Sequence, residues 1–570
     1  MIRFSLSPLR TSCFLLLVLL SVKATRADDP VDFQPLKDSF AQAVEVELAE
    51  GITPGFSVAW IVDGKVVHSA GYGLADWESK KPATAETIYR AGSISKLFNA
   101  IAVMQLVEQD KLDLDAPIQK ALPDFSIVNP FADTTPITLR QMLSHRSGMI
   151  REAPVGGYLD PSQPSIKDTQ ASVSGAVLVN PPNKVMRYSN VGPTIAGEAV
   201  VTASATEYPA YQTKYILEPL GMKHSTWVMN DGLRPQLAKG KMRIARDGGA
   251  YTFDVAPEFE LGTIPAGNLY TTASDLAKFA IFMLGSDASA ELTPPLVHPA
   301  TFEMMCYPQL IDDNTGFGLG FYVGEFRGRK TLQHGGAVYG FSTVIIAIPE
   351  ERIAVLVLSN ADIASAPVRR LADVSLNLLF EKLRGETPAE VPKFVNLESE
   401  QLAKLAGEYE SESYWAKLEV EGDRLVGTLS GQPLAFRANS PLKLMARGRM
   451  MNDAPFEFEA AADGTIKGFT AAGQEFKRVA ESVPGTPAAW RELVGVYGPE
   501  FIPLVVSVRN GHLYGAIENE YEYRLKPIDR VTFALPPGMY TDEQLVFQID
   551  STGKAIGAIL ANQYLSRRGD

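Results

Sequence analysis

The sequence predicts a mixed α/β domain, with an antiparallel sheet flanked by helices and an inserted helical subdomain, followed by two small antiparallel β domains. Three observations predict this fold class. Strand-like segments stand near both ends of the region 28–385, and segments of helical period lie between them. The remaining tail switches to alternation and turns and contains an internal repeat.

Two hairpins are predicted to supply the central sheet of the first domain. Residues 56–62 and 66–70 are apolar stretches around an Asp-Gly pair, which is typical of tight hairpin turns. Residues 341–348 and 353–358 are apolar and β-branched around a turn that begins with proline. Because these hairpins lie far apart in the chain, we expect one sheet with helices inserted between its strands.

Two helices are predicted from their apolar pattern. Residues 97–107 are apolar nearly all round, which indicates a buried helix. Residues 366–383 have helical period and are predicted to close the first domain, which we assign to residues 28–385.

The tail is predicted to hold two related domains. Residues 386–393 contain two prolines and no periodicity, as in a linker. Residues 405–409 (LAGEY) recur as residues 493–497 (LVGVY), and other glycine and leucine positions recur at nearly the same offset. We expect two small β-barrel-like or sandwich domains, at residues 395–482 and 488–570.

Residues 1–27 are predicted to be a signal peptide. Arg3 and Arg10 give it a basic start, residues 14–20 form a short apolar core, and Ala27 suits cleavage before Asp28. An uncleaved anchor is the alternative. The predicted location is therefore exported, either periplasmic or secreted.

Charge and cysteine content narrow the class of protein further. The composition is globular, with 46% hydrophobic and 21% charged residues. Loss of the four basic residues of the signal would take the net charge from −13 to −17, which disfavours nucleic acid as a partner. Only Cys306 would remain, so no internal disulfide is expected.

Ser93 and Lys96 form an S-x-x-K pattern directly before the predicted buried helix. Residues three apart on a helix share one face, so the hydroxyl and the amine can meet. The first turn also offers unpaired N–H groups that can stabilise an oxyanion. The alternative for the isolated pattern is a capping serine beside a surface lysine.

Two further short patterns contain polar groups suited to hydrolysis. Tyr188 and Asn190 form Y-x-N, in which the phenol could relay a proton and the amide could orient Lys96. His334 is followed by Gly335 and Gly336 near the end of a predicted strand, where the missing side chains would let a substrate lie along the edge. Taken singly, each pattern is equally compatible with a turn or a packed side chain.

In this order, the three patterns resemble those of the family of serine β-lactamases and penicillin-binding proteins, nearest to class C β-lactamases and D,D-peptidases. The resemblance covers roughly residues 34–384 and includes GYGLAD at 71–76, LSHRSGM at 143–149 and GNLYTTASDL at 267–276. These last three segments are taken as scaffold signatures without a chemical role. The resemblance implies a β-lactamase-like first domain, and the layout with two trailing β domains resembles that of D-aminopeptidases.

The resemblance implies a role for each matching residue. Ser93 would be the nucleophile and Lys96 would help to deprotonate it. Tyr188 would act as proton relay or base, and Asn190 would support the pair. Whether Lys96 or Tyr188 is the general base stays open.

His334 stands where the family usually has the lysine of K-T-G, with Gly335 and Gly336 after it. The backbone N–H groups of Ser93 and Ala337 would form the oxyanion hole. Because a titratable imidazole replaces a permanent charge, β-lactam hydrolysis is less expected. An ordinary imidazole pKa of about 6.5 would make activity change between about pH 5 and 8.

Other mechanisms find less support in the chain. There is no G-x-S-x-G for a Ser-His-Asp esterase, and no Gly-rich phosphate loop before a helix. The six histidines are scattered without paired metal-ligand spacing, so neither a metal nor another cofactor is expected. A non-catalytic relative would have lost some of the serine, lysine and tyrosine, and all three are present.

The sequence therefore predicts an exported serine hydrolase that forms an acyl-enzyme on Ser93. The expected substrates are D-amino-acid peptides or amides, as for a D-aminopeptidase or a D,D-carboxypeptidase. A carboxylesterase or weak β-lactamase, and a non-catalytic peptidoglycan-binding or ligand-binding sensor, are the alternatives. The expected partner is a small peptide, amide or ester, association with the cell wall is a further expectation, and nothing in the sequence predicts an oligomeric state.

Overall fold

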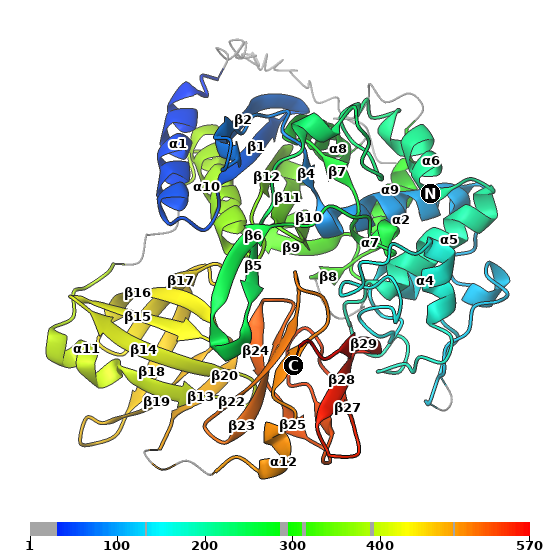
Figure 1. Cartoon of the computed structure of the whole chain (residues 1–570). Helices are drawn as coiled ribbons and strands as arrows, with labels where there is room; N and C mark the ends of the chain where they lie inside the picture. The colour runs from blue at the N-terminus through cyan, green and yellow to red at the C-terminus, as the bar shows by residue number, and fades with distance from the viewer. Residues whose placement is uncertain are drawn as a thin grey trace, which may run out of the picture.

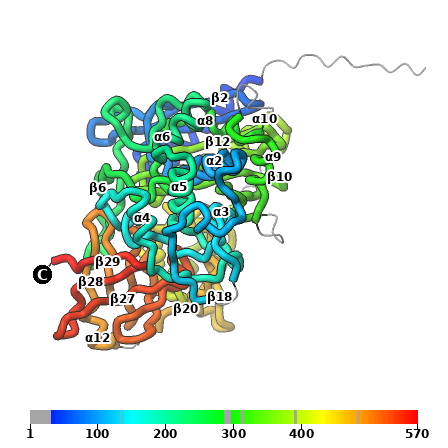
Figure 2. Tube along the Cα trace, turned by 90° about the vertical axis from the view of Figure 1, so that its right-hand side faces the viewer, coloured from blue at the N-terminus to red at the C-terminus, as the bar shows by residue number. Residues whose placement is uncertain are grey.

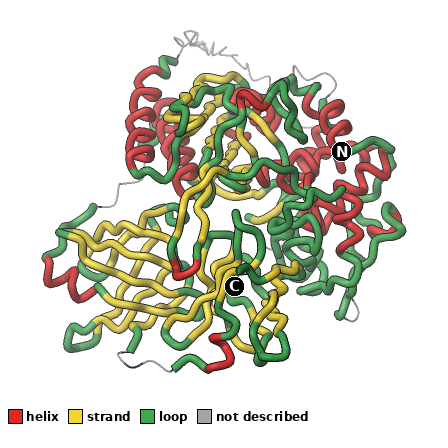
Figure 3. Tube along the Cα trace, in the orientation of Figure 1, coloured by secondary structure: helices red, strands yellow, loops and turns green. Residues whose placement is uncertain are grey.

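A computed structural model of the chain describes residues 31–131, 134–285, 295–309, 315–387, 393–480, 482 and 485–569. The predicted signal peptide at 1–27 and the middle of the predicted linker, 388–392, lie outside the described residues. A domain of mixed helix and strand occupies the upper part of Figure 1, above two domains built mostly of strands (Figure 3).

The first domain is built on an antiparallel sheet with the strand order β3-β2-β1-β12-β11-β10-β9-β8. Both predicted hairpins are confirmed, as β1–β2 and β11–β12, and they meet in the middle of the sheet, with Val58 opposite Val357. The strands are β1 (Gly55–Val62), β2 (Lys65–Asp76), β3 (Lys81–Pro82), β8 (Gly316–Phe317), β9 (Tyr322–Phe326), β10 (Arg329–Val338), β11 (Phe341–Ile348) and β12 (Ile353–Ser359).

Helices cover both faces of this sheet, which explains why β1, β11 and β12 are buried along their whole length. The helices α1 (Gln34–Ala49) and α10 (Ser365–Arg384) pack on one face, where Phe40 and Leu371 join the residues of the sheet in one apolar cluster. On the other face α8 (Ala273–Met283) contacts β1 and β12.

The predicted helical insertion lies between the two hairpins in sequence. Its helices are α2 (Ser95–Glu108), α3 (Leu139–Leu143), α4 (Ile166–Ser172), α5 (Val191–Ser204), α6 (Tyr208–Gln212), α7 (Ile264–Gly267), α8 and α9 (Pro299–Met305). The helix predicted at 97–107 is α2, and every position from 95 to 104 is buried, so no face of this part of the helix meets water, while its last turn is half-buried. The closing helix predicted at 366–383 is α10. None of the described helices is both long enough and apolar enough to cross a membrane.

The first tail domain is a closed eight-stranded barrel. It begins with a short helix, α11 (Ser399–Leu405), and continues through β13 (Gly407–Glu410), β14 (Trp415–Glu421), β15 (Arg424–Leu429), β16 (Gln432–Ser440), β17 (Lys443–Gly448), β18 (Ala454–Ala460), β19 (Ile466–Ala471) and β20 (Gln474–Arg478). Its core is separate from that of the first domain and contains stacked aromatic rings, Phe469 and Phe476 having centroids 4.6 Å apart.

The second tail domain has two sheets, of the orders β21-β22-β23-β24 and β25-β26-β27-β28-β29. Its elements are α12 (Ala488–Arg491), β21 (Gly495–Tyr497), β22 (Leu504–Arg509), β23 (His512–Ile517), β24 (Tyr521–Arg524), β25 (Lys526–Pro527), β26 (Thr532–Ala534), β27 (Gln544–Ile549), β28 (Ala555–Leu560) and β29 (Gln563–Ser566). The alternating pattern of the tail did not predict the short helices α11 and α12.

The repeat in the tail sequence has a structural counterpart. Tyr409 pairs with Arg478 and donates its hydroxyl to the carbonyl of Leu405 at 2.7 Å. In the second copy, Tyr497 pairs with Arg567 and donates to the carbonyl of Leu493 at 2.6 Å. The bridge between Tyr497 and Arg567 joins the two sheets of the second tail domain. The two copies of the repeat therefore have a similar barrel-like arrangement of strands.

The second tail domain packs directly against the first domain. Its Phe501 ring lies 5.3 Å from the ring of Tyr339 and 5.4 Å from that of Phe259. The hairpin of β5 (Lys241–Ala245) and β6 (Tyr251–Val255) descends from the first domain between the two tail domains (Figure 1), and the view turned by 90° also places it beside the second tail domain (Figure 2). The backbone nitrogen of Ala245 donates to Asn519 at 2.9 Å.

The sequence-predicted fold class is therefore confirmed, including the antiparallel sheet, its flanking helices and the two trailing β domains. Whether the domain limits at 28–385, 395–482 and 488–570 mark independently folding units stays a prediction.

Candidate active site

Ser93 lies in the 3₁₀ turn Gly92–Ile94, which leads straight into α2. Gly92 has a φ of 55°, and a Cβ there would come within 2.7 Å of the backbone nitrogen of Ala337. Only glycine therefore lets this turn approach β10 so closely. The turn and the strand bring the backbones of Ser93 and Ala337, the predicted oxyanion hole, to the wall of one pocket.

Lys96 follows Ser93 by one helical turn, and its side chain is buried beside the serine hydroxyl. Its Nζ donates to Ser93 Oγ at 3.1 Å, to Asn190 Oδ1 at 2.7 Å and to the carbonyl of Ala266 at 2.7 Å. Burial lowers the pKa of Lys96 well below its usual value, and the charge of Glu152 acts in the opposite direction. An amine of lowered pKa in contact with a hydroxyl is equipped to accept its proton.

Tyr188 stands on the other side of Ser93, just before α5. Burial raises the pKa of Tyr188 to about 12, while a hydrogen bond with the side chain of Ser93 acts to lower it. The Lys96 Nζ lies 4.9 Å from the centroid of the Tyr188 ring, and the imidazole of His145 stacks on its face at 4.2 Å. At neutral pH the group is a phenol, which suits a proton relay better than a base.

Asn190 is held by a carboxylate that the sequence analysis did not single out. Its Nδ2 donates to Glu152 Oε1, which fixes the amide with Oδ1 towards Lys96. Burial raises the pKa of Glu152 to about 7, and the neighbouring Arg151 acts to lower it. Glu152 also accepts a hydrogen bond from the backbone nitrogen of Tyr158 at 3.1 Å. The orientation of Asn190 therefore depends on Glu152.

His334 lies on β10, with its ring centroid 6.3 Å from that of Tyr188. The imidazole is 5% exposed. Burial, and then the charge of Lys96, lower the pKa of His334 to about 4. The ordinary pKa of about 6.5 that the sequence suggested is therefore wrong for this site, because the imidazole is desolvated beside an amine. The group is neutral at physiological pH.

Beyond Gln333, the β9 side of β10 has no strand partner among the described residues and could accept a substrate. β10 pairs with β9 only through residues 329–333, while its other side pairs with β11 as far as Val338. A Cβ on Gly336 would lie 2.0 Å from the carbonyl of Ala91, so this glycine is needed for packing. Gly335 and Ala337 are exposed along the edge, where an extended substrate could lie.

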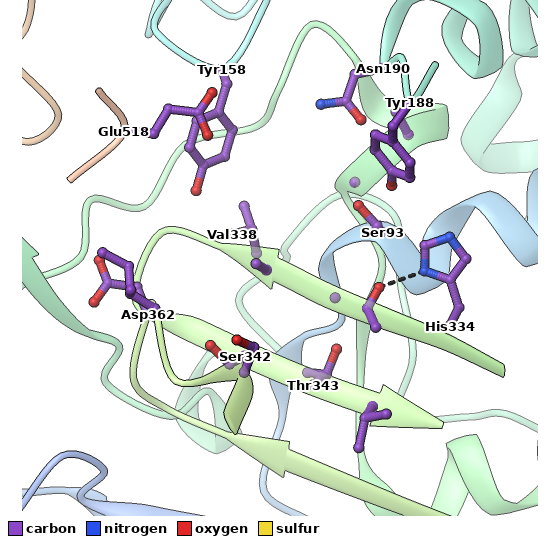
Figure 4. Close-up of a pocket in the computed structure, with 18 of the residues that line it drawn as sticks. Ser93, Tyr158, Tyr188, Asn190, His334, Val338, Ser342, Thr343, Asp362 and Glu518 are labelled. Atoms are coloured by element: carbon purple, nitrogen blue, oxygen red, sulfur yellow. Dashed lines mark hydrogen bonds between the residues drawn. The ribbon is translucent and has the colours of Figure 1, made fainter. Parts of the chain in front are cut away.

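The pocket in front of Ser93 has a volume of about 540 Å³. Ser93, Tyr188, Asn190 and His334 lie at one end of it, and Tyr158, Asp362 and Glu518 lie at the other (Figure 4). Met450 of the barrel and residues of the second tail domain also line the pocket. All three domains thus contribute to its wall.

The end of the pocket away from Ser93 is acidic. Glu518 and Glu520 reach it from the turn between β23 and β24 of the second tail domain. Burial, and then the neighbouring Glu518, raise the pKa of Glu520 to about 8. Its carboxylate has no hydrogen-bond or ion-pair partner in the part of the chain that the structure describes. Burial likewise raises the pKa of Asp362 to about 7.

The structure brings together all eight residues singled out from the sequence, namely Ser93, Lys96, Tyr188, Asn190, His334, Gly335, Gly336 and Ala337. Sequence reasoning missed His145 and Glu152. His145 lies inside the segment 143–149, to which no chemical role was assigned, and Glu152 follows that segment closely, so both could have been considered. No pattern in the sequence pointed to Glu518 or Glu520.

Comparisons with known proteins agree with this geometry. The family model described as beta-lactamase matches residues 40–378. Protein flp of Staphylococcus aureus (strain MW2) is 24% identical over 330 residues, which cover 57% of this chain but 63% of that protein. The unguisins hydrolase ungD' of Aspergillus campestris is 27% identical over 368 residues, covering 61% of this chain and 67% of that protein.

Two solved structures share the fold. The octameric penicillin-binding protein homologue from Pyrococcus abyssi is superposed with a TM-score of 0.54 at 24% identity, covering 86% of this chain and 99% of that one. The D-alanine carboxypeptidase AmpC from Burkholderia cenocepacia gives a TM-score of 0.51 at 19% identity, covering 60% of this chain and 99% of that one. Since the family model matches more than half of the chain and the first domain has the corresponding fold, the protein belongs to the beta-lactamase family.

Proposed function

We propose that the protein is a serine hydrolase that acylates Ser93 and acts on small peptides or amides of D-amino acids with a free amino group. The contact that carries this proposal is the one between Lys96 Nζ and Ser93 Oγ, 3.1 Å long. Because burial lowers the pKa of Lys96, the neutral amine is more accessible than in an exposed lysine, next to the hydroxyl that it would deprotonate.

Acylation would begin when Lys96 accepts the hydroxyl proton and Ser93 Oγ attacks the substrate carbonyl. The backbone N–H groups of Ser93 and Ala337 would bind the oxyanion of the tetrahedral intermediate. Tyr188 would pass a proton to the leaving amine as the C–N bond breaks. A water molecule would then attack the ester carbonyl, giving up its proton to the same Lys96–Tyr188 pair, and Ser93 would leave with its proton restored.

The acidic end of the pocket supports a substrate that bears an ammonium group. Glu518 and Glu520 face the same space as Ser93, and a bound ammonium group would lower the raised pKa of Glu520 and form an ion pair with its carboxylate. The carboxylate of a β-lactam or of a peptide C-terminus would face the carboxyl groups of Glu518 and Glu520, which supply no positive charge, and a neutral His334 supplies none either. This favours an aminopeptidase over a D,D-carboxypeptidase, a weak β-lactamase or a carboxylesterase. The D configuration rests on the likeness in domain layout.

The test combines covalent labelling with substrate competition. A fluorophosphonate should label Ser93, as located by mass spectrometry of the digested protein. D-Alanine p-nitroanilide should be hydrolysed faster than its N-acetyl derivative and faster than the L-isomer. Label on another serine would overturn the nucleophile. Equal rates for the free and acetylated amines would overturn the substrate class, and absence of both labelling and hydrolysis would favour a binding protein.

Export and association with the cell wall are proposed on the strength of residues 1–27 alone. N-terminal sequencing of the protein recovered from the producing cells tests the first point. A mature protein that begins at Asp28 supports export with cleavage, and an intact Met1 overturns cleavage.

A further inference from the structure

Two loops of the first domain together present most of the site, namely residues 145–152 and 187–190. They are joined to each other by several hydrogen bonds, among them one from the backbone nitrogen of Asn190 to the carbonyl of Arg151 at 2.8 Å. The paired loops hold His145, Glu152, Tyr188 and Asn190 around the Lys96 amine. Any displacement of the loops relative to each other would move the phenol and the amide that serve Ser93.

A buried carboxylate of the second tail domain bonds to both of these loops. Glu543, in the turn before β27, accepts a hydrogen bond from the backbone nitrogen of Arg151 at 3.1 Å through its Oε1. The same oxygen accepts from Arg187 Nη2 at 2.9 Å. The side chains of Glu543 and Arg187 are 2% and 8% exposed, so this contact is shielded from solvent. One oxygen atom thus joins the Arg151 loop to the residue that precedes Tyr188.

The same turn also contacts the Arg151 side chain. The guanidinium carbon of Arg151 lies 5.5 Å from the ring centroid of Tyr540 and 5.6 Å from that of Tyr188. Tyr540 in turn donates its hydroxyl to Glu518, which lies 3.8 Å from Arg151 Nε. Arg151 is therefore held between the second tail domain and the catalytic tyrosine.

We propose that Glu543 is a positioning residue, through which the second tail domain keeps the loops 145–152 and 187–190 in a fixed position relative to each other. Without this carboxylate, the backbone N–H of Arg151 and the guanidinium of Arg187 would both lose a buried acceptor, and Arg187 Nε already has no partner among the described residues. The loops would shift to find other partners, and a shift of about 1 Å at reacting groups costs on the order of 100-fold in rate.

The inference rests on the proposed function, and the variants Glu543→Ala and Glu543→Gln test it in the full-length chain. The matched control is Asp542→Ala, since Asp542 lies 3.5 Å from the same Arg187 but is 54% exposed. For each variant, we would measure kcat and KM on D-alanine p-nitroanilide, the rate of labelling by a fluorophosphonate, and backbone hydrogen exchange. Rates are normalised to the fraction of protein that is folded by circular dichroism.

Glu543→Ala should lower kcat and the labelling rate about 10-fold to 100-fold with KM changed less than about threefold, because the reacting groups move while the acidic pocket remains. Glu543→Gln, which keeps one acceptor oxygen, should recover part of the loss, and Asp542→Ala should stay within about twofold of the wild type. Exchange should rise in residues 145–152 and 187–190. A normalised kcat equal to that of the wild type in Glu543→Ala would overturn the inference.

Hydrogen exchange separates this inference from the proposed function. A wild-type protein that neither labels nor hydrolyses would overturn the hydrolase proposal, whereas faster exchange in both loops of Glu543→Ala would still support the positioning role. Unchanged exchange in both loops would contradict that role whatever the activity.

Discussion

The Nδ1 atom of His334 lies 2.5 Å from the carbonyl oxygen of Gly335. Because a carbonyl oxygen can only accept, Nδ1 bears the proton and Nε2 is the unprotonated nitrogen of the ring. Nε2 is buried and has no hydrogen-bond partner among the described residues. The site thus contains a neutral imidazole with a free acceptor nitrogen, where related enzymes with K-T-G would have a positive charge.

This arrangement predicts that the protonation of His334 does not change the activity near neutral pH. Since burial and Lys96 lower the pKa of His334 to about 4, its charge appears only as the pH falls through that value, and activity should fall with it. We would compare kcat/KM of the wild type and His334→Gln from pH 3.5 to 8 on one neutral substrate. The limb near pH 4 should be absent from the variant. A wild-type limb between pH 5 and 8 that His334→Gln removes would contradict this.

Ser93→Ala should abolish labelling and lower hydrolysis by about 10³-fold or more, because no acyl-enzyme can form. The matched control is Ser95→Ala in the same motif. Ser95 donates to the carbonyl of Gly92 at 2.6 Å and accepts from the backbone of Leu269, so its loss should cost about 1 kcal/mol of stability but leave labelling of Ser93 in place. Thermal unfolding and mass spectrometry distinguish the two outcomes.

Glu152→Gln should lower kcat/KM about 10-fold, since a neutral amide no longer fixes the direction of the Asn190 side chain. The charge of Glu152 raises the pKa of Lys96, so its removal should lower that pKa and move the acid limb of the rate profile to lower pH. Glu198→Gln, at a carboxyl with 7% exposure outside the pocket, is the control. An acid limb that moves to higher pH would argue against this arrangement.

Glu520→Gln should raise KM for D-alanine p-nitroanilide about 10-fold and leave the N-acetyl derivative unaffected, because only the free ammonium can pair with the carboxylate. Glu500→Gln, at a side chain that is 73% exposed in the same domain, should change neither substrate. Equal effects of Glu520→Gln on both substrates would show that Glu520 shapes the pocket without binding an amine.

Much of the fold could be predicted from the sequence because its determinants are local. The Asp63-Gly64 turn has positive φ angles of 50° and 72°, as a tight hairpin between two apolar runs requires. The all-round apolar pattern of α2 specified a buried helix, and the spacing of Ser93 and Lys96 specified that the two side chains meet. The repeat in the tail was visible because the segments 405–409 and 493–497 match at an offset of 88, and Tyr409 and Tyr497 in these segments make the same contacts in the two copies.

Other features depend on contacts that no local pattern contains. The pKa of His334 depends on how completely the surrounding elements exclude water, so a histidine in a short motif could not predict its value. The acidic end of the pocket comes from Glu518 and Glu520, more than 400 residues beyond Ser93 in the chain. Only the packing of the second tail domain on the first brings them there.

The sequence by itself therefore determined the two hairpins, the long helices α2 and α10 and the candidate residues around Ser93, since periodicity, turn residues and helical spacing act over a few positions. The tertiary structure decided what surrounds that set. The hydrogen bond from Arg151 to Glu543 joins residues 392 positions apart. Such a bond forms because apolar surfaces of two domains pack together and leave buried polar groups that must find partners, and this depends on the whole fold.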